Sequence, residues 1–289
     1  MVGDRATDPP AAMPRVSFGP AEVSRLVLGA NPINGGSHLS GFVNQQMKRY
    51  FTEEKVLALL QRCRELGVNT WQSGEVNLAI WQRFCETNGP MHLLALAAEN
   101  PDDPDQIGHL ARAGVLGIAH HGEVTDTLFK AGRLEEAHEF CKRLRDAGVQ
   151  VGVSTHMPAV IEAVEERGWD IDFYMACVYE RHRTREELLG LLGHVPIPLR
   201  EVYLESDPPR MCEAIRQTPK TCLALKILAA GRLCDRPETV EAAFRFTFES
   251  IKPQDAVVVG IYPEYTDQVA EDVALTVRYG GRAQGEASL

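Results

Sequence analysis

RLEEAHEFCKRLRDAGVQVGVSTHMPAVIEAVEER, residues 133–167, contains the structural unit that recurs along this chain. Arg133–Ala147 has the apolar period of a helix and closes on Gly148. The apolar run Val149–Val153 then has the length of a buried strand, and the polar pair Thr155-His156 follows it. Pro158–Arg167 is helical again. A strand followed by a helix is the repeating unit of parallel α/β folds.

Eight short apolar runs of this kind end abruptly in polar residues. Eight strand–helix units predict a closed parallel (β/α)8 TIM barrel, and such barrels carry their active sites on the loops after the strands. The length of 289 residues suits one barrel of this type, which needs about 250. The runs are Arg25–Gly29, Val68–Trp71, His92–Ala98, Val115–Ala119, Val149–Val153, Ile171–Cys177, Cys222–Leu228 and Ala256–Gly260.

The remaining segments predict additions to the barrel. Residues 14–28 are predicted to form an N-terminal β-hairpin that turns at Gly19-Pro20 and plugs the N-terminal mouth of the barrel. Asn31–Phe51 is polar and rich in glycine, which predicts a long functional loop without a helix. Before Cys222, helices at Arg183–Gly193 and Pro209–Thr218 should flank an extended piece and form a lid or wall. The expected division is a flexible tail 1–13, one barrel domain 14–280 and a flexible tail 281–289.

Composition excludes several classes of function. The formal net charge of −10 argues against a nucleic-acid partner, because phosphate binding needs a basic surface. No apolar stretch approaches the roughly 20 residues that span a membrane. Seven cysteines without a CxxC pair indicate reduced thiols and a cytoplasmic location. The expected partner is therefore a small-molecule substrate, and the sequence is compatible with a homo-oligomer.

Histidines follow two neighbouring predicted strands. LGIAHHG places His120 and His121 at the end of one strand, where alternation points one of them inward, and VGVSTH places His156 after the next. With Glu99 from the preceding strand, His121 and His156 make a candidate site for zinc, manganese, iron or nickel. The alternative is that these histidines orient a polar substrate without a metal.

Lys226 is the other notable candidate. In TCLALKILAAGR, strand alternation puts Cys222, Ala224 and Lys226 on one face, which we expect to be the barrel interior. An unpaired buried ammonium is costly, so the lysine needs a partner. It could anchor a substrate, transfer protons or form an imine, or it could pair internally with Glu99 or Glu75.

Further polar residues in the loops after strands are candidates for substrate binding. Each is equally consistent with a solvated loop residue. They are Asn31, His38, Gln72, Glu75, Asn77, Tyr179, Glu180 and Arg183.

Four segments resemble the aldo/keto reductase superfamily. VSRLVLGANPINGG is similar to the opening hairpin and strand of that family, ELGVNTWQSG to its second strand, GVSTHMPAVIEAV to its fifth strand and helix, and VVVGIYPEYTDQVAEDV to its closing segment. The resemblance extends from about residue 14 to about residue 279. It implies the same barrel, and for a typical member it would imply carbonyl reduction by NADPH.

The catalytic residues of that family are largely replaced here. Gln72 stands where the family has its Asp, Asn77 where it has its Tyr, and Glu99 or a neighbour where it has its Lys. Only the family's His has a counterpart, in His120 or His121. Without a Tyr to donate the proton, the usual reduction lacks its acid, so NADPH is not expected.

Three hypotheses for the function follow. The favoured one is a non-redox lyase, isomerase or epimerase that acts on a polyhydroxylated or carboxylated small molecule, with Lys226, His121, His120 and Glu99 as catalytic residues and with a metal or Lys226 polarising the substrate. Metal-assisted hydrolysis by the same ligands stays open. The alternative is a divergent NADPH-dependent oxidoreductase with another acid, such as His121 or Tyr179. The third is a barrel that binds a ligand without catalysis.

Overall fold

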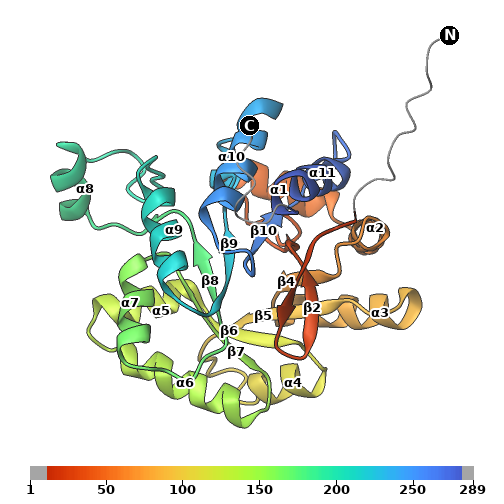
Figure 1. Cartoon of the computed structure of the whole chain (residues 1–289), viewed down its shortest axis with the longest axis horizontal. Coiled ribbons are helices and arrows are strands. Elements are labelled where there is room, and N and C mark those ends of the chain that lie inside the picture. Colours follow the sequence, from red (N-terminus) through yellow and green to blue (C-terminus); the bar gives the residue numbers. More distant parts are fainter. Residues whose placement is uncertain (1–11, 282–289) are drawn as a thin grey trace.

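The computed structural model describes residues 12–281 and forms a closed barrel of eight parallel strands surrounded by helices (Figure 1). The strands are hydrogen-bonded in the order β10-β3-β4-β5-β6-β7-β8-β9, so each pairs with its neighbour in the chain and the last closes on the first. The predicted TIM barrel and all eight of its strands are confirmed. The strands are β3 Leu26–Gly29, β4 Thr70–Ser73, β5 His92–Ala97, β6 Gly117–His120, β7 Gln150–Thr155, β8 Phe173–Cys177, β9 Thr221–Leu225 and β10 Ala256–Gly260.

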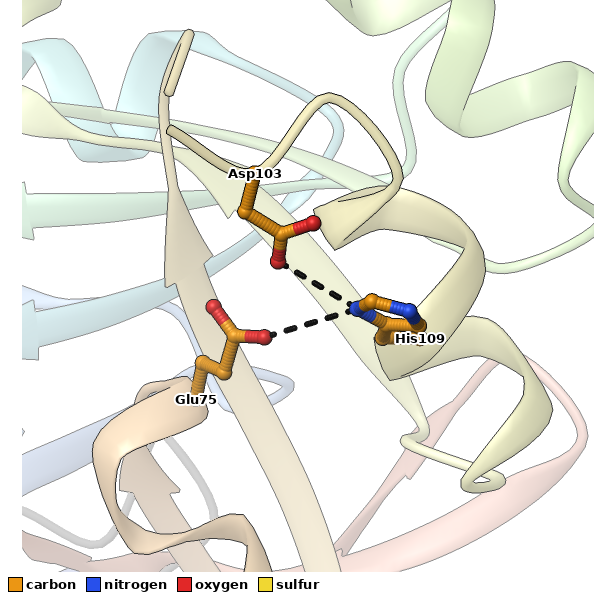
Figure 2. Close-up of side chains that lie close together, drawn as sticks. All are labelled: Glu75, Asp103 and His109. Carbon is orange, nitrogen blue, oxygen red and sulfur yellow. Dashed lines mark hydrogen bonds and ion pairs between the residues drawn. The ribbon is translucent and has the colours of Figure 1, made fainter. Parts of the chain in front are cut away.

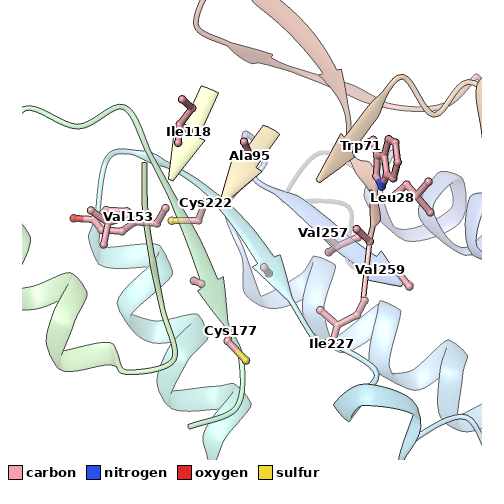
Figure 3. Close-up of a cluster of buried hydrophobic side chains, with 14 of the residues drawn as sticks. Leu28, Trp71, Ala95, Ile118, Val153, Cys177, Cys222, Ile227, Val257 and Val259 are labelled. Carbon is pink, nitrogen blue, oxygen red and sulfur yellow. The ribbon is translucent and has the colours of Figure 1, made fainter. Parts of the chain in front are cut away.

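Two apolar layers hold the barrel together, because strands of a parallel barrel are buried on both faces. Inside, side chains such as Leu94, Phe173 and Val258 form one cluster. Outside, residues such as Trp71 and Ile118 pack against the helices in a larger cluster, part of which is drawn in Figure 3. The near-continuous apolar runs of the sequence therefore correspond to strands with two buried faces.

A glycine inside β7 shows how tightly the interior is filled. A Cβ atom at Gly152 would lie 2.4 Å from Cζ of Phe173, whose side chain is fully buried. The ring of Phe173 occupies the space that a side chain at position 152 would need. It also packs on Phe18 of the N-terminal hairpin, with ring centroids 4.8 Å apart.

The predicted N-terminal hairpin is confirmed. Its strands are β1 Arg15–Phe18 and β2 Ala21–Ser24, and they pair antiparallel on either side of Gly19-Pro20. Val16, Phe18 and Val23 of the hairpin belong to the inner cluster of the barrel. The hairpin therefore closes the N-terminal mouth and leaves the opposite mouth for a site.

Helices follow the strands and cover the outside of the barrel (Figure 1). The predicted helical segments are confirmed with small shifts at their ends, and the side chain of Thr52 caps the start of α2. The helices are α1 Gly41–Tyr50, α2 Glu53–Glu65, α3 Leu78–Asn88, α4 Gln106–Arg112, α5 Gly122–Lys130, α6 Leu134–Asp146, α7 Pro158–Glu166, α8 Arg185–Leu192, α9 Asp207–Gln217, α10 Pro237–Ser250 and α11 Gln268–Gly280.

Two predictions about the connections are wrong. The long loop Asn31–Phe51 contains helix α1, which Ser40 caps and which anchors itself by burying Met47. The glycines that suggested a loop all precede residue 42, so nothing in residues 42–50 breaks a helix. In the other connection, Val202–Glu205 has no regular secondary structure, because no neighbouring strand pairs with it.

Residues 1–11 and 282–289 of the two predicted tails lie outside the described residues, and Met13 packs against the outer cluster. Within residues 12–281, no helix has both the length and the apolar character that a membrane span requires.

Candidate active site

A cavity of about 450 Å³ opens at the carboxyl end of the barrel. Each of the eight strands contributes to its wall, either directly or through the residues that follow it. Active sites of TIM barrels lie at this end. In chain order from β3 to β10, the strands contribute Asn31, Gln72, Leu96, His121, His156, Arg181, Lys226 and Gly260.

Lys226 reaches this cavity for a reason that strand alternation did not predict. In β9, Leu223 lies in the inner cluster, whereas Cys222 and Ala224 face the helices, so the predicted faces of this strand are wrong. The strand ends at Leu225, and Lys226 has a left-handed backbone with φ of 62°. This turn breaks the alternation and brings the lysine into the cavity wall.

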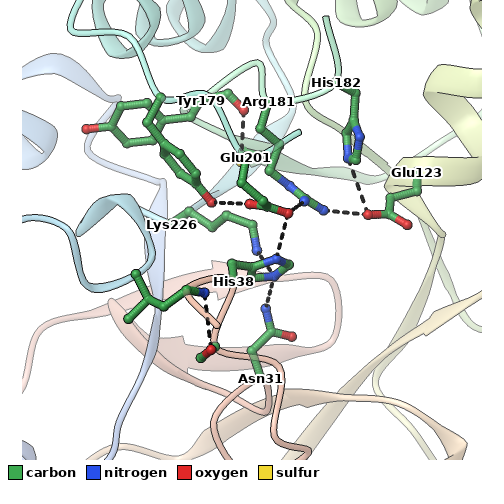
Figure 4. A network of polar contacts seen from close by, with 12 residues as sticks. Asn31, His38, Glu123, Tyr179, Arg181, His182, Glu201 and Lys226 are labelled. Carbon is green, nitrogen blue, oxygen red and sulfur yellow. Dashed lines mark hydrogen bonds and ion pairs between the residues drawn. The ribbon is translucent and has the colours of Figure 1, made fainter. Parts of the chain in front are cut away.

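A hydrogen-bonded chain runs from Lys226 through His38 to Glu201 (Figure 4). Nζ of Lys226 lies 2.9 Å from Nε2 of His38, and Nδ1 of His38 lies 3.0 Å from Oε1 of Glu201. The amide nitrogen of Asn31 also approaches Nε2 of His38, at 3.1 Å. The hydroxyl group of Tyr203 donates to Glu201 at 3.0 Å.

All three residues of this chain have an unfavourable backbone. His38, Glu201 and Lys226 have φ values of 56°, 63° and 62°, and they are three of the five non-glycine residues with positive φ in residues 12–281. Each such residue costs on the order of 1 kcal/mol, and such strain concentrates at functional sites. Three strained residues from three separate segments therefore meet in one hydrogen-bonded chain.

Arg181 fixes the carboxylate end of the chain. Its guanidinium donates to Glu201 and, at 2.5 Å, to Glu123 (Figure 4). Burial alone would raise the pKa of Glu201, but the hydrogen bond from His38 and the charge of Arg181 outweigh it and lower this pKa to about 2. The contact with Nε2 of His182 at 3.3 Å, together with Arg181, holds the pKa of Glu123 well below its usual range despite partial burial. Both carboxyl groups are therefore ionised at neutral pH.

A second imidazole–carboxylate pair faces the same cavity. Nδ1 of His156 lies 2.7 Å from Oδ2 of Asp126, which also accepts the backbone N–H of His156 at 3.1 Å. The hydroxyl group of Thr155 donates to Asp126 at 2.5 Å. Burial lowers the pKa of His156 more than the contact with Asp126 raises it. The neutral ring therefore donates from Nδ1 and keeps the lone pair of Nε2 for another partner.

A glycine makes room for this second pair. Gly122 opens α5, and a Cβ atom there would lie 2.9 Å from Oγ of Ser154 and 3.2 Å from Cε1 of His156. Both Ser154 and His156 line the cavity. A side chain at position 122 would displace the imidazole from its place beside Asp126.

The structure resolves the choice between the two adjacent histidines. His121 lines the cavity, and its buried Nδ1 has no hydrogen-bond partner among the described residues. His120, predicted to be catalytic, faces away from it, binds the hydroxyl group of Thr125 at 2.7 Å and packs on Phe140. Burial, with the nearby His121, lowers the pKa of His120 to about 4. This places His120 in the layer between strand and helix as a structural residue.

Glu99 lies outside the site. The strand before it ends at Ala97, and Glu99 is exposed and pairs with Arg143 of α6. The predicted ligand set of His121, His156 and Glu99 is therefore not assembled. Because no carboxylate in residues 12–281 lies within 4.0 Å of Lys226, the internal ion pair with Glu99 or Glu75 does not form either.

The predicted substrate-binding residues divide into two groups. Asn31, His38 and Gln72 line the cavity. Glu75 and Asn77 do not: Glu75 lies in the rim group described below, and the Asn77 amide is buried and donates to Asn34 and Ser73.

The candidates after β8 also turn away from the cavity. Arg183 is buried and binds Asp207 and Glu180. Tyr179 packs against Tyr203 with ring centroids 5.0 Å apart, and burial raises the pKa of Tyr179 to about 12. These residues hold the segment after β8 in place, and Arg181 is the one that enters the cavity wall.

A separate group of possible metal ligands lies on the rim of the barrel (Figure 2). Glu75, Asp103 and His109 each place one ligand atom within 4.8 Å of the others. Nδ1 of His109 lies 3.2 Å from Asp103 and 3.8 Å from Glu75, and Nε2 lies 3.4 Å from Asp105. These three residues do not line the cavity. The geometry allows a divalent ion at the rim, apart from Lys226 and His156.

Four charged residues of the site escaped sequence analysis. Asp126 lies within α5 and looks like an ordinary helical carboxylate, and Glu123 likewise. Glu201 and Arg181 lie in irregular segments without a motif. The one available signal concerned Glu201, which lies within residues 183–218, the segment expected to form a wall of the site.

Comparison with known proteins adds information about the fold. No family profile matches the chain, and no curated protein matches it. A solved structure assigned as a 2,5-diketo-D-gluconic acid reductase B shares 14% identity over 91% of this chain and 85% of its own, with a TM-score of 0.53. The barrel resembles those of the aldo/keto reductases at the level of the fold.

Enzymes of other classes have similar barrels. A truncated 3-deoxy-D-arabino-heptulosonate 7-phosphate synthase from Thermotoga maritima shares 10% identity over 92% of this chain and 91% of its own, with a TM-score of 0.54. The matched structures thus include synthases and reductases, and they agree in the barrel alone.

Proposed function

We propose that this protein is an enzyme, a lyase or isomerase that moves a proton next to the carbonyl group of a small hydroxylated substrate. The observation that carries the proposal is the strained chain of Lys226, His38 and Glu201 at the cavity, whose wall also contains His156 with its partner Asp126. Two imidazole–carboxylate pairs and an amine in one cavity are the groups that proton transfer beside a carbonyl requires.

The cavity has the size and lining of a small-molecule site. Its volume of about 450 Å³ is within the usual range of about 300–1,000 Å³ for ligand pockets. Apolar residues such as Leu39 and Met47 line part of it, and the amides of Asn31 and Gln72 supply hydrogen-bond donors and acceptors. Hydroxyl groups of a substrate suit these amides.

The two polar chains would have different roles. An ammonium of Lys226 can donate to a substrate carbonyl and stabilise the negative charge that develops on its oxygen. His156, with Nδ1 engaged by Asp126, presents Nε2 as the base that takes the proton from the adjacent carbon. Arg181 is already paired with Glu201 and Glu123, which favours a hydroxylated substrate over one with an additional carboxylate.

Reduction by NADPH has weaker support in this site. At the positions of the family's proton donor and its lysine, Asn77 and Glu99 are both turned away from the cavity. The residues present therefore do not provide the acid that hydride transfer needs. Oxidation of NADPH with any carbonyl compound would support the divergent oxidoreductase instead.

Metal participation is a separate proposal. The reaction above assigns polarisation to Lys226, and a divalent ion would bind at Glu75, Asp103 and His109 on the rim. Metal analysis of the purified protein, with His109→Ala as the variant, tests this site. Metal that is retained in the variant would place it elsewhere.

The test of the proposed function is hydrogen exchange. The protein is incubated in D2O with short-chain sugars, hydroxyketones and 2-oxo acids, and proton NMR follows deuterium entering beside the carbonyl. We expect exchange that His156→Gln slows by roughly 10²-fold or more, the usual contribution of a general base. Glu99→Gln is the control and should exchange at the wild-type rate. Binding of a panel compound without exchange would favour the non-catalytic barrel.

A further inference from the structure

We infer that Lys226 is a nucleophile that forms an imine with the carbonyl carbon of its substrate, so that the substrates of this site are aldehydes or ketones. The inference rests on the proposed function and gives Lys226 a covalent role in it: a protonated imine withdraws electrons from the neighbouring carbon in place of the hydrogen bond from the ammonium. It follows from the arrangement of Lys226, His38 and Glu201 (Figure 4).

The hydrogen bonds fix the protonation state of His38. The side-chain nitrogen of Asn31 and the amine of Lys226 both approach Nε2, at 3.1 Å and 2.9 Å. The amide nitrogen can only donate, so Nε2 is the acceptor. Nδ1 then carries the proton and donates it to Glu201 at 3.0 Å. His38 therefore presents a lone pair to Lys226 and can take a proton from its ammonium.

This arrangement is that of an activated nucleophile. A nucleophile within hydrogen-bond reach of a base, which a third group orients, is the general signature of covalent catalysis. Here Lys226 is the nucleophile, His38 the base and Glu201 the carboxylate that orients the base. Arg181 and Tyr203 hold the carboxylate in turn.

The surroundings of Lys226 favour the neutral amine that such an attack requires. Burial lowers the pKa of Lys226, and the positive charge of Arg181 lowers it further, against the opposing influence of Cys177 and Glu201. Glu201, the carboxylate of this hydrogen-bonded chain, is bound by Arg181 and His38 and not by the lysine. The amine is therefore held without the ion pair that would keep it charged.

The step balances without any further reagent. The lone pair of Nζ attacks the carbonyl carbon, a C–N bond forms, and the electron pair of the C=O bond moves to the oxygen, which takes a proton. Nε2 of His38 takes one proton from the nitrogen and supplies the one that the oxygen takes, which gives a carbinolamine. It then takes the second N–H proton and passes it to the hydroxyl group, and water leaves as the C=N bond forms. The products are one imine and one water, and nothing is oxidised or reduced.

The experiment traps this imine. The full-length protein is incubated with glycolaldehyde and sodium cyanoborohydride near pH 6.5, where exposed lysines are protonated, and the adduct is located by peptide mass spectrometry. We expect one adduct at Lys226, formed at least about 10-fold faster than at any other lysine. Lys226→Met should lose it, while Lys142→Met, which changes an exposed lysine of α6, should retain it.

A second variant tests whether Lys226 is activated by His38 and Glu201 or is labelled only because it is accessible. Glu201→Gln keeps the shape of the side chain but removes the charge that orients His38 and that raises the pKa of both His38 and Lys226, so trapping should slow and its pH profile should move to lower pH. An unchanged profile in this variant would show that the chain does not activate the lysine and would overturn the inference. Equal labelling of many lysines in the wild-type protein, or the same adduct level in Lys226→Met, would overturn it as well.

Imine trapping and hydrogen exchange test the inference and the proposed function separately. Hydrogen exchange without an adduct would keep the lyase or isomerase and exclude the imine. An adduct without exchange would keep the nucleophile and exclude proton transfer by His156.

Discussion

Asp272 offers a stability test that requires no substrate. It lies in α11, its carboxyl group is buried, and no salt bridge to it exists within residues 12–281. Burial, with a smaller influence of Glu271, raises the pKa of Asp272 to about 8. The change to test is Asp272→Asn, which replaces the carboxyl group with a neutral group of nearly the same shape.

The sign and the size follow from proton linkage. An unfolded Asp titrates near 3.9, so between about pH 4 and about pH 8 the folded chain keeps a proton that the unfolded chain has lost. Stability is therefore fully present below the unfolded pKa and is lost as the pH rises to the folded pKa, by at most about 1.4 kcal/mol per pH unit. From about pH 5 to about pH 9 this amounts to at most about 4 kcal/mol. The Asn variant lacks this loss.

The measurement is equilibrium urea unfolding at several pH values, followed by the fluorescence of three tryptophans, Trp71, Trp81 and Trp169, all of which are buried. The free-energy difference between Asp272→Asn and the wild type should grow by several kcal/mol from about pH 5 to about pH 9. Asp146→Asn, an exposed position at the end of α6, is the control and should show no such growth.

One outcome refutes the reasoning. If the wild type and Asp272→Asn lose stability in parallel as the pH rises, then the carboxyl group is not protonated in the folded state at neutral pH. The group would then have a partner or water access, and burial alone would not govern its titration.

Three further predictions concern packing and the site. Gly152→Ala should lower the free energy of unfolding by about 2 kcal/mol or more, because the added methyl group would overlap the fully buried ring of Phe173. The control is Gly190→Ala in exposed α8, which should be neutral or slightly stabilising in thermal melting. Arg183→Met should cost about 3 kcal/mol in urea unfolding, because it leaves buried Asp207 with only the longer contact to exposed Arg210 at 3.7 Å. A change in ligand binding at constant stability would contradict this structural role. His120→Ala should lower the melting temperature, whereas His121→Ala should leave it nearly unchanged and alter glycolaldehyde trapping. The reverse pattern would mean that His121 packs under the helices and His120 faces the cavity.

The sequence predicted the barrel well because its strands are buried on both faces. Such strands read as continuous apolar runs, and the run Ala256–Gly260 coincides with β10. Structure in the connections is harder to predict from the sequence, because a helix such as Gly41–Tyr50 depends on one capping serine and one buried methionine. Propensity alone does not decide such a short segment.

The site was predicted in part for a related reason. Residues that follow strands directly, such as His156 and His121, were found from their position. Alternation failed at Lys226, because a left-handed residue ends the pattern and no sequence rule predicts lysine in that conformation. Asp126 and Glu201 act through contacts 30 and 163 residues away in the chain, and such contacts depend on the tertiary fold.

The left-handed backbones of His38, Glu201 and Lys226 also bear on how this protein could evolve or be engineered. Glycine at any of these positions would relieve about 1 kcal/mol of strain and would be favoured in a selection for heat resistance. Each such replacement removes one member of the hydrogen-bonded chain that connects amine, imidazole and carboxylate. A library selected only for thermal tolerance should therefore accumulate glycine at positions 38, 201 and 226, and the proteins it yields should bind ligands in an intact barrel while their lysine chemistry is lost.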